Sequence, residues 1–326
     1  MSHVAETIKQ IIEPVASDLI EVEKTVLSDL QSDIPLIKKI SDYIVSAGGK
    51  RMRPLILILI ARALGYQGKD HIFLATMIEY VHTASLLHDD VVDESDLRRG
   101  KPTACFKWGN SAAVLVGDFM YSRAFQLMVQ TKNIRICEIV SGAVNRVSEG
   151  EVIQLLNIHD TTVNEERYFE VIERKTGVLF EAAARMAATI GGATSEEEEK
   201  LTEYALALGT AFQIIDDVLD YRGEEGKTGK TLGADLREGK MTMPLIYALR
   251  KCSEEQAAQI KEAVKRGDGD LEAITRILNE TGAIEECVIT AKQIVSSGIE
   301  AISFLKPSLY KESLIKLLSL TVERDL

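Results

Sequence analysis

Apolar residues recur at helical spacing along most of this chain, which predicts a protein built of α-helices. In residues 1–46 the recurrence predicts two helices, through Ile8, Ile11, Ile12, Val15 and Leu19. Further helical segments are expected at 74–92, from about 101 to 150, at 168–190, at 195–220 and through 241–326. Ser195 precedes four glutamates, as an N-cap followed by an acidic first turn would.

The segment Leu55–Leu64 is uniformly apolar, so its composition alone also fits a buried strand. Pro54 in front suits the first turn of a helix, and Gly65 suits its end. No segment that could pair with such a strand is evident in the sequence. We therefore expect a helix here, entered through the glycine-containing segment 47–53.

The composition favours one helical domain over residues 1–326. The chain has 326 residues, of which 46% are hydrophobic and 27% charged, so it can bury a large core. It has 6 prolines, where average usage would give roughly 16. None lies between Pro102 and Pro244, and no Pro/Ser-rich linker divides the chain.

The net charge of −12 argues against nucleic acid as a partner and against broad contact with anionic membranes. The four cysteines lie far apart, with no Cys-x-x-Cys pair, as expected for reduced thiols of a cytoplasmic protein. The first residues do not resemble a secretory signal, and the apolar run Leu55–Ala61 is too short to span a bilayer.

Three aspartates end the apolar segment Leu74–Val92 in an Asp-Asp-x-x-Asp cluster, made of Asp89, Asp90 and Asp93. On a helix, Asp89 and Asp93 lie about 40° apart on one face. Two such carboxylates repel each other unless a cation lies between them. Oxygen ligands without His or Cys at ligand spacing favour Mg²⁺. A solvated acidic helix end is the alternative for a single cluster.

The same spacing recurs in Asp216, Asp217 and Asp220, again after an apolar helical segment and again before basic residues. Mg²⁺ bound by carboxylates keeps room for water and phosphate oxygens. Two such clusters together predict that a diphosphate is held between them.

Basic residues gather in two further places. Lys50, Arg51 and Arg53 stand at a predicted helix N-terminus, which predicts an anion site, with an ordinary exposed basic turn as the alternative. Segment 222–240 combines glycines with lysines and suggests a basic lid over phosphate; Gly229-Lys230-Thr231 lacks the earlier glycine of a P-loop. His82 fits either a packed histidine or a ligand.

These motifs resemble the trans-isoprenyl diphosphate synthase family. The resemblance runs from Gly48 to Lys240 and more loosely beyond, and is most specific in the two Asp clusters, in Arg98-Arg99-Gly100 and in the segment 209–215. The string from Glu79 to Ser95 is similar to the bacterial long-chain branch. The resemblance implies an all-α, single-domain bundle around a deep central cavity, usually a homodimer, with at most peripheral membrane contact for product release.

The activity implied is Mg²⁺-dependent condensation of isopentenyl diphosphate onto an allylic diphosphate, with three Mg²⁺ per site and farnesyl diphosphate as starter. By the resemblance, isopentenyl diphosphate is held by Lys50, Arg53, His82 and Arg99. The allylic diphosphate is held or covered by Arg98, Lys175, Thr176, Gln213, Lys230 and Lys240. Asp89, Asp93 and Asp216 are the expected Mg²⁺ ligands, while Asp90, Asp217 and Asp220 act through water. Catalytic charge stabilisation falls to Asp89, Asp90, Asp93, Arg98, Lys175, Asp216 and Lys230.

Small residues before the first cluster predict a long product. Ala84 and Ser85 lie one turn before Asp89, and Val81 lies one turn further. The resemblance implies that the cavity follows this helix, so that an aromatic residue at 84 or 85 would block a growing chain, as in short-chain members of the family. Met128 and Val140 are candidates for the end of the tunnel. An eight-unit (octaprenyl) product for quinone side chains is expected, with a shorter-chain synthase or a non-catalytic partner subunit as alternatives. A terpene cyclase would have no need of Lys50, Arg53 and His82.

Overall fold

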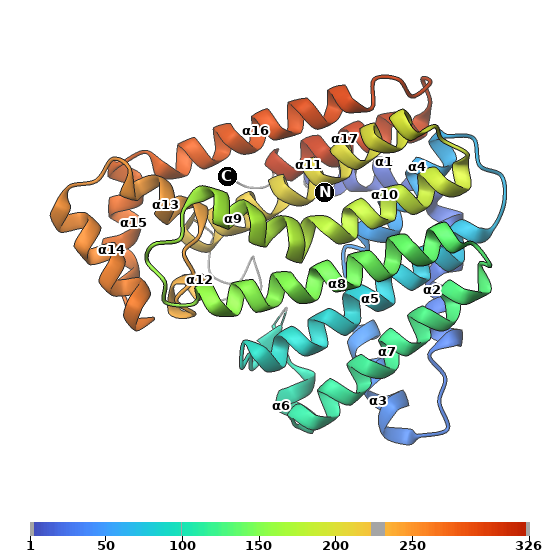
Figure 1. Ribbon diagram of the computed structural model, residues 1–326, viewed down its shortest axis with the longest axis horizontal. Helices are drawn as coiled ribbons and strands as arrows, with labels where there is room; N and C mark the ends of the chain where they lie inside the picture. Colours follow the sequence, from blue (N-terminus) through green and yellow to red (C-terminus); the bar gives the residue numbers. More distant parts are fainter. Residues whose placement is uncertain (1–2, 99, 223–231, 324–326) are drawn as a thin grey trace. The chain divides into compact units, whose positions relative to one another are not determined.

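The computed structural model describes residues 3–98, 100–222 and 232–323, and it is built of α-helices with one short β-hairpin (Figure 1). The all-α fold that the sequence predicts is confirmed. The chain forms two compact units from non-contiguous segments. Unit 1 comprises Met1–Val144, Leu179–Ala205 and Ala301–Leu317, and unit 2 comprises Asn145–Val178, Leu206–Glu300 and Leu318–Leu326. The expectation of a single domain stays a prediction.

The N-terminal segment holds three α-helices where the apolar pattern predicts two. They are α1 (His3–Ile12), α2 (Ala16–Asp29) and α3 (Pro35–Ser46), with a 3-10 turn at Glu13–Val15. Pro14 lies in that turn, and proline cannot donate the backbone hydrogen bond that would continue α1. The apolar period runs on through this break, so periodicity alone does not reveal it.

Helix α4 (Met52–Ala63) forms the core of unit 1 and confirms the helical interpretation of the uniformly apolar segment. Every side chain from Leu55 to Ala61 is at most 4% exposed, so the helix is surrounded on all sides. Helix α5 (Asp70–Val92) packs against α2, α4 and α7 (Asn110–Gln130). Figure 1 shows α5 and α7 side by side.

A β-hairpin follows α5 and places basic residues close to its end. Leu97–Arg98 (β1) pairs antiparallel with Lys101–Pro102 (β2), and Gly100 turns between them at φ +72°. Helix α6 (Ala104–Trp108) leads into α7, and α8 (Ile134–Asn157) follows.

The helix expected over residues 168–190 contains a π-helical segment at Glu173–Gly177, between α9 (Glu165–Ile172) and α10 (Val178–Gly191). Gly177 is tightly packed, because a Cβ there would lie 3.2 Å from a methyl group of Leu206.

The next helix, α11 (Ser195–Arg222), begins with a cap one residue earlier than expected. Thr194, rather than Ser195, accepts a hydrogen bond at its Oγ1 from the backbone N–H of Glu197, and the Glu197 carboxylate accepts one from the N–H of Thr194. This reciprocal pair is a capping box, which sequence spacing places equally well at either residue.

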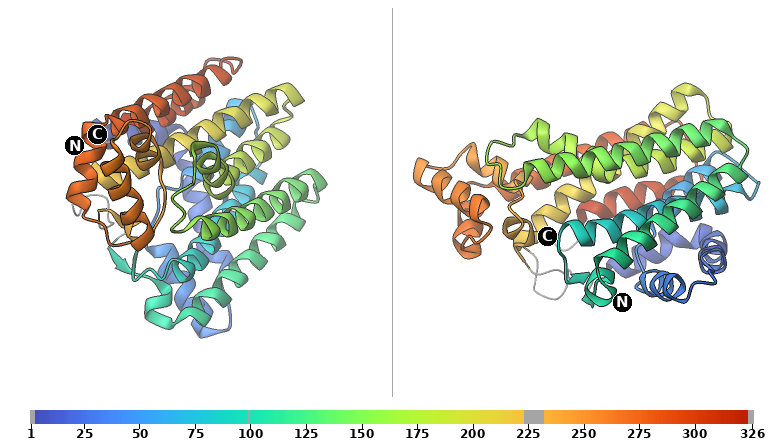
Figure 2. Two further views of the ribbon diagram at one scale, coloured as in Figure 1. Left: turned by 60° about the vertical axis from the view of Figure 1, so that its left-hand side comes forward. Right: turned by 60° about the horizontal axis from the view of Figure 1, so that its bottom comes forward.

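The C-terminal part is helical as expected. Its helices are α12 (Ala234–Arg237), α13 (Met243–Leu249), α14 (Glu254–Arg266), α15 (Leu271–Glu280), α16 (Ala283–Ala301) and α17 (Leu309–Glu323). Helices α14 and α15, orange in Figure 2, pack together within unit 2. Among the residues described, no helix is both long and apolar enough to cross a membrane.

Candidate active site

The first Asp cluster lies at the C-terminal end of α5, in unit 1. Asp89 and Asp93 are half-buried and one turn apart, and the N–H of Asp93 donates to the carbonyl of Asp89 over 2.8 Å. This arrangement places both carboxylates on one helix face, as the spacing predicts. Both are oxygen donors suited to a hard divalent cation.

Asp90 has different surroundings, because its side chain is completely buried. Arg98 Nε, on β1, donates a 2.6 Å hydrogen bond to its Oδ1, while its Oδ2 has no hydrogen-bond partner within the described structure. Burial raises the pKa of Asp90, with Arg98 acting against this and Asp89 and Asp93 reinforcing it. The contact favours a positioning role for Asp90: it holds Arg98 beside the cluster.

The basic residues at the start of α4 also lie in unit 1. Lys50 is exposed in the α3–α4 loop, and Arg53 is half-buried in the first turn of α4. The guanidinium of Arg53 lies 4.6 Å from the centre of the Phe180 ring, and its Nε is buried with no hydrogen-bond partner in the part of the chain described. Burial lowers the pKa of Arg53 to about 10, so it stays charged at neutral pH. His82 is half-buried on α5.

The second Asp cluster lies on α11, in unit 2, where a chain of hydrogen bonds includes its middle residue. Tyr168 on α9 donates through its hydroxyl to Asp217 Oδ2 over 2.7 Å, and Gln213 Nε2 donates to Asp217 Oδ1 over 2.8 Å. Thr176 donates to Gln213 Oε1 over 3.3 Å. Asp217 is 1% exposed, and burial raises its pKa well above the ordinary value. Thr176 and Gln213 are thus brought together as expected.

Asp216 is half-buried beside Asp217, whereas Asp220 caps a helix. The Asp220 carboxylate accepts hydrogen bonds from the backbone N–H groups of Ala234 and Asp235, both 3.1 Å long, at the start of α12. Asp217 and Asp220 are therefore engaged with protein donors, in keeping with an indirect role toward a metal.

Two lysines of the expected site are paired with glutamates within unit 2. Lys175, in the π-helical segment, lies 2.7 Å from Glu151 Oε2 on α8. Lys240 follows α12, where its backbone N–H donates to the carbonyl of Asp235 and its ammonium pairs with Glu238. Each lysine has a carboxylate that a bound diphosphate would have to compete with.

Three expectations lie outside the described residues, wholly or in part. They are Arg99, Lys230 and, of the basic lid over 222–240, residues 223–231. Over the residues that are described, no group of three or more His, Cys, Asp or Glu side chains is placed to hold a metal ion.

The residues expected to control product length lie on three helices and belong to unit 1. Val81, Ala84 and Ser85 on α5 are buried, at 1%, 0% and 8% exposure. Ser85 donates its hydroxyl to the carbonyl of His82 over 2.9 Å, so its polarity is satisfied within α5. Val140 on α8 is buried and Met128 on α7 is half-buried. Their role stays a prediction.

Three residues that sequence reasoning did not assign, Tyr168, Glu151 and Glu79, take part in these contacts. Tyr168 and Glu151 bond to expected site residues, and no local pattern distinguishes them beforehand. Arg51 and Glu79 pair with each other beside Arg53. For Glu79 a signal existed: it is an acidic residue within the apolar segment Leu74–Val92.

Comparison with known proteins agrees with these motifs. The family model for polyprenyl synthetase matches residues 34–281. The chain is 46% identical to the octaprenyl diphosphate synthase of Escherichia coli (strain K12) over 320 residues, covering 98% of this chain and 99% of that one.

Two solved structures are similar over nearly their whole length. A decaprenyl diphosphate synthase from Rhodobacter capsulatus has a TM-score of 0.92 at 38% identity, covering 97% of this chain and 99% of that one. A polyprenyl synthase from Caulobacter crescentus CB15, complexed with calcium and isoprenyl diphosphate, has a TM-score of 0.94 at 35% identity, covering 98% of each chain. The chain belongs to the polyprenyl synthetase family and is a prenyltransferase.

Proposed function

We propose that this enzyme is a long-chain all-trans polyprenyl diphosphate synthase, which adds isopentenyl diphosphate units successively to an allylic diphosphate such as farnesyl diphosphate. The relatives named above support this proposal, because they are named for eight-unit and ten-unit products. We expect an eight-unit product, after the relative from Escherichia coli.

The observation that carries the proposal of a condensing synthase is the half-buried guanidinium of Arg53. A half-buried guanidinium with an unsatisfied Nε, next to Lys50 at the N-terminus of α4, is suited to an anion. The helix beside α4 is α5, which carries His82 and the first Asp cluster. An enzyme that only ionises one diphosphate has no need of this second cationic site, whereas a condensing synthase has two diphosphates to bind.

Mg²⁺ is the proposed cofactor, three ions per site, with Asp89, Asp93 and Asp216 as its protein ligands. Carboxylate oxygens fit this ion, and the hydrogen bonds that Asp90, Asp217 and Asp220 accept from protein donors favour an indirect role for these three. When bound, the metal would supply positive charge to the diphosphate. The relative from Caulobacter crescentus, complexed with calcium and isoprenyl diphosphate, supports a divalent cation.

The protein's own groups would act through charge and orientation. Arg98, Lys175 and Lys230 stabilise the negative charge that grows on the allylic diphosphate as its C–O bond breaks. Lys50, Arg53, His82 and Arg99 hold isopentenyl diphosphate so that its double bond attacks the allylic carbon. The proton lost afterwards passes to the departing diphosphate.

The decisive experiment is incubation of pure protein and Mg²⁺ with farnesyl diphosphate and labelled isopentenyl diphosphate, followed by sizing of the product. We expect one dominant product near eight units. Cyclised hydrocarbons or no consumption of isopentenyl diphosphate would refute the proposal, and a product of three or four units would refute the long-chain assignment.

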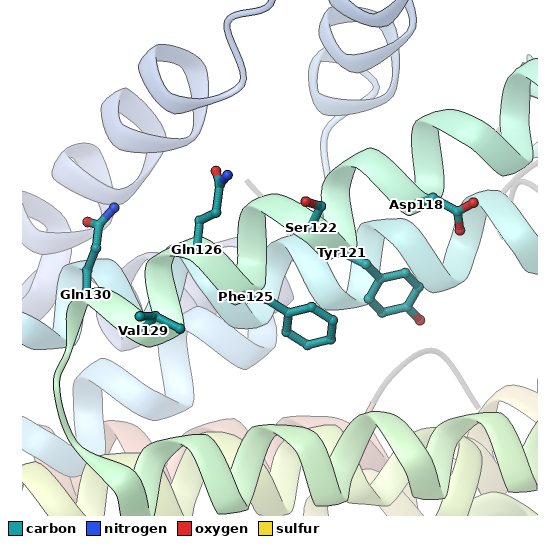
Figure 3. A pocket seen from close by; sticks show the side chains of 7 residues that line it. All are labelled: Asp118, Tyr121, Ser122, Phe125, Gln126, Val129 and Gln130. Atoms are coloured by element: carbon teal, nitrogen blue, oxygen red, sulfur yellow. The ribbon is translucent and has the colours of Figure 1, made fainter.

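We further propose that the enzyme is a homodimer in which a second copy covers an exposed face of α7. An open groove of about 640 Å³ is lined there by Asp118, Tyr121, Ser122, Phe125, Gln126, Val129 and Gln130. Figure 3 shows the rings of Tyr121 and Phe125 projecting from the same side of the helix. Val129 is 65% exposed and Phe125 37%, and Asp118 is the one charged residue among the groove residues named. A two-fold dimer pairs such a face with itself.

The proposed dimer is tested by measuring the molar mass of the protein by light scattering as it elutes from a size-exclusion column. Val129→Asp should convert dimer to monomer, because burying a charge opposite its own copy is unfavourable. Phe73→Asp is the matched control, since Phe73 is also an exposed apolar residue, 44% exposed on α5. A monomeric wild-type protein, or a Val129→Asp variant that stays dimeric, would contradict this assignment.

A further inference from the structure

A buried carboxylate lies next to the proposed isopentenyl diphosphate site. Glu79 is 5% exposed on α5, one turn before His82, and its charge opposes the lowering of the Arg53 pKa by burial. A negative charge so close to a diphosphate site should weaken anion binding. Its presence therefore needs a reason that outweighs this repulsion.

The backbone at the entry to α4 supplies a reason. Arg51 is the N-cap residue of α4, and it has φ 46° and ψ 36°, a left-handed conformation that residues with a Cβ adopt only at a cost. Its carbonyl accepts the helix bond from Leu55 N–H over 3.0 Å, so the conformation of Arg51 fixes how the loop joins the helix. Lys50 precedes it and Arg53 follows it by two residues.

The side chain of Arg51 is held mainly by Glu79. Its Nη1 donates to Glu79 Oε1, and the pair is largely buried. Its Nη2 makes longer contacts, 3.5 Å to the carbonyl of Val45 and 3.8 Å to Glu23, which is mostly exposed. Buried charged pairs with hydrogen bonds are strong, whereas exposed ones contribute little.

We infer that Glu79 is a positioning residue for isopentenyl diphosphate: by holding Arg51 in the left-handed conformation it sets the start of α4, and with it Lys50 and Arg53, before the substrate arrives. This inference rests on the proposed function. It predicts that loss of the Glu79 charge weakens isopentenyl diphosphate binding, although one negative charge near the site has been removed.

The main variant is Glu79→Gln, which keeps size and shape. We expect the KM for isopentenyl diphosphate to rise roughly tenfold, because the cost of the left-handed conformation at Arg51, no longer offset by Glu79, is equivalent to about a tenfold change in affinity. The KM for the allylic diphosphate should change less than about twofold. Glu23→Gln is the matched control and should leave both KM values unchanged.

A double-mutant cycle tests the route through Arg51. Glycine adopts φ 46° without strain, so in an Arg51→Gly background Glu79→Gln should have little further effect on the KM for isopentenyl diphosphate. Additive effects would overturn the route through Arg51.

Failure of the proposed function and failure of the positioning role of Glu79 give different results. Wild-type protein that does not consume isopentenyl diphosphate would overturn the proposed function and this inference together. Normal wild-type turnover, with a Glu79→Gln KM for isopentenyl diphosphate equal to or lower than wild type, or with both KM values raised alike, would overturn the positioning role alone.

Discussion

Replacing Tyr168 with phenylalanine removes one hydroxyl group and leaves the buried ring in place. That hydroxyl donates to Asp217 Oδ2 over 2.7 Å, and both residues are almost fully buried, at 5% and 1% exposure. A hydrogen bond to a charged group contributes about 1.5–3 kcal/mol, against about 0.5–1.5 kcal/mol for a neutral one. We therefore expect the free energy of unfolding to fall by about 2 kcal/mol.

Activity should change as well, because Asp217 Oδ1 also accepts from Gln213, which in turn accepts from Thr176. A carboxylate with one unsatisfied oxygen will shift or take up a proton, and this disturbs Gln213. We expect the KM for the allylic diphosphate to rise by up to about tenfold, with little change for isopentenyl diphosphate.

Tyr204→Phe is the matched control. Its hydroxyl donates to the neutral carbonyl of Leu314 over 2.8 Å, and the residue is fully buried. It should cost about 1 kcal/mol and leave both KM values unchanged. Urea unfolding followed by circular dichroism, with steady-state kinetics for each substrate, measures both effects. Equal destabilisation by the two variants, or an unchanged allylic KM in Tyr168→Phe, would refute the reasoning.

Three further predictions concern the metal ligands, the product and the pH dependence of stability. Asp89→Ala and Asp216→Ala should each lower turnover by orders of magnitude while the helical circular-dichroism signal survives; near-normal turnover at saturating Mg²⁺ would refute their role as ligands. Ala84→Phe should shift the product to about fifteen or twenty carbons, since an isoprene unit and a helical turn are both roughly 5 Å long; an unchanged product length would show that the chain does not pass this turn. Burial lowers the pKa of His71 below its ordinary value, so its neutral form is favoured in the folded state and stability should fall as the pH drops below about 6.5. Thermal unfolding between pH 7.5 and 5.5 should show this loss in wild type and a smaller one in His71→Gln; identical pH profiles would rule out His71 as the cause.

The sequence predicted the features that depend on residues of one kind recurring at helical spacing and on the residues at helix ends. The positions of Asp89 and Asp93 on one face follow from four-residue spacing, and α4 follows from Pro54 and Gly65 at its ends. What it could not show depends on contacts between distant segments. The pairing of Arg51 with Glu79 joins two different helices. Whether a carboxylate such as Asp90 is accessible to a metal ion depends on its burial, which the spacing of residues does not show.

Because of the π-helical segment Glu173–Gly177, the number of residues between Tyr168 and Thr176 matters as much as their identity. Tyr168 and Thr176 are eight positions apart, which on a regular α-helix would set them about 80° apart around the axis. A π turn takes up one extra residue, so the eight positions turn roughly as seven would, and the two side chains come within about 20° of each other. That is how both can bond to the same turn of α11, through Asp217 and Gln213. Deleting a single residue here, even one with no contact of its own, would put Tyr168 and Thr176 out of register and should be harder to tolerate than many substitutions.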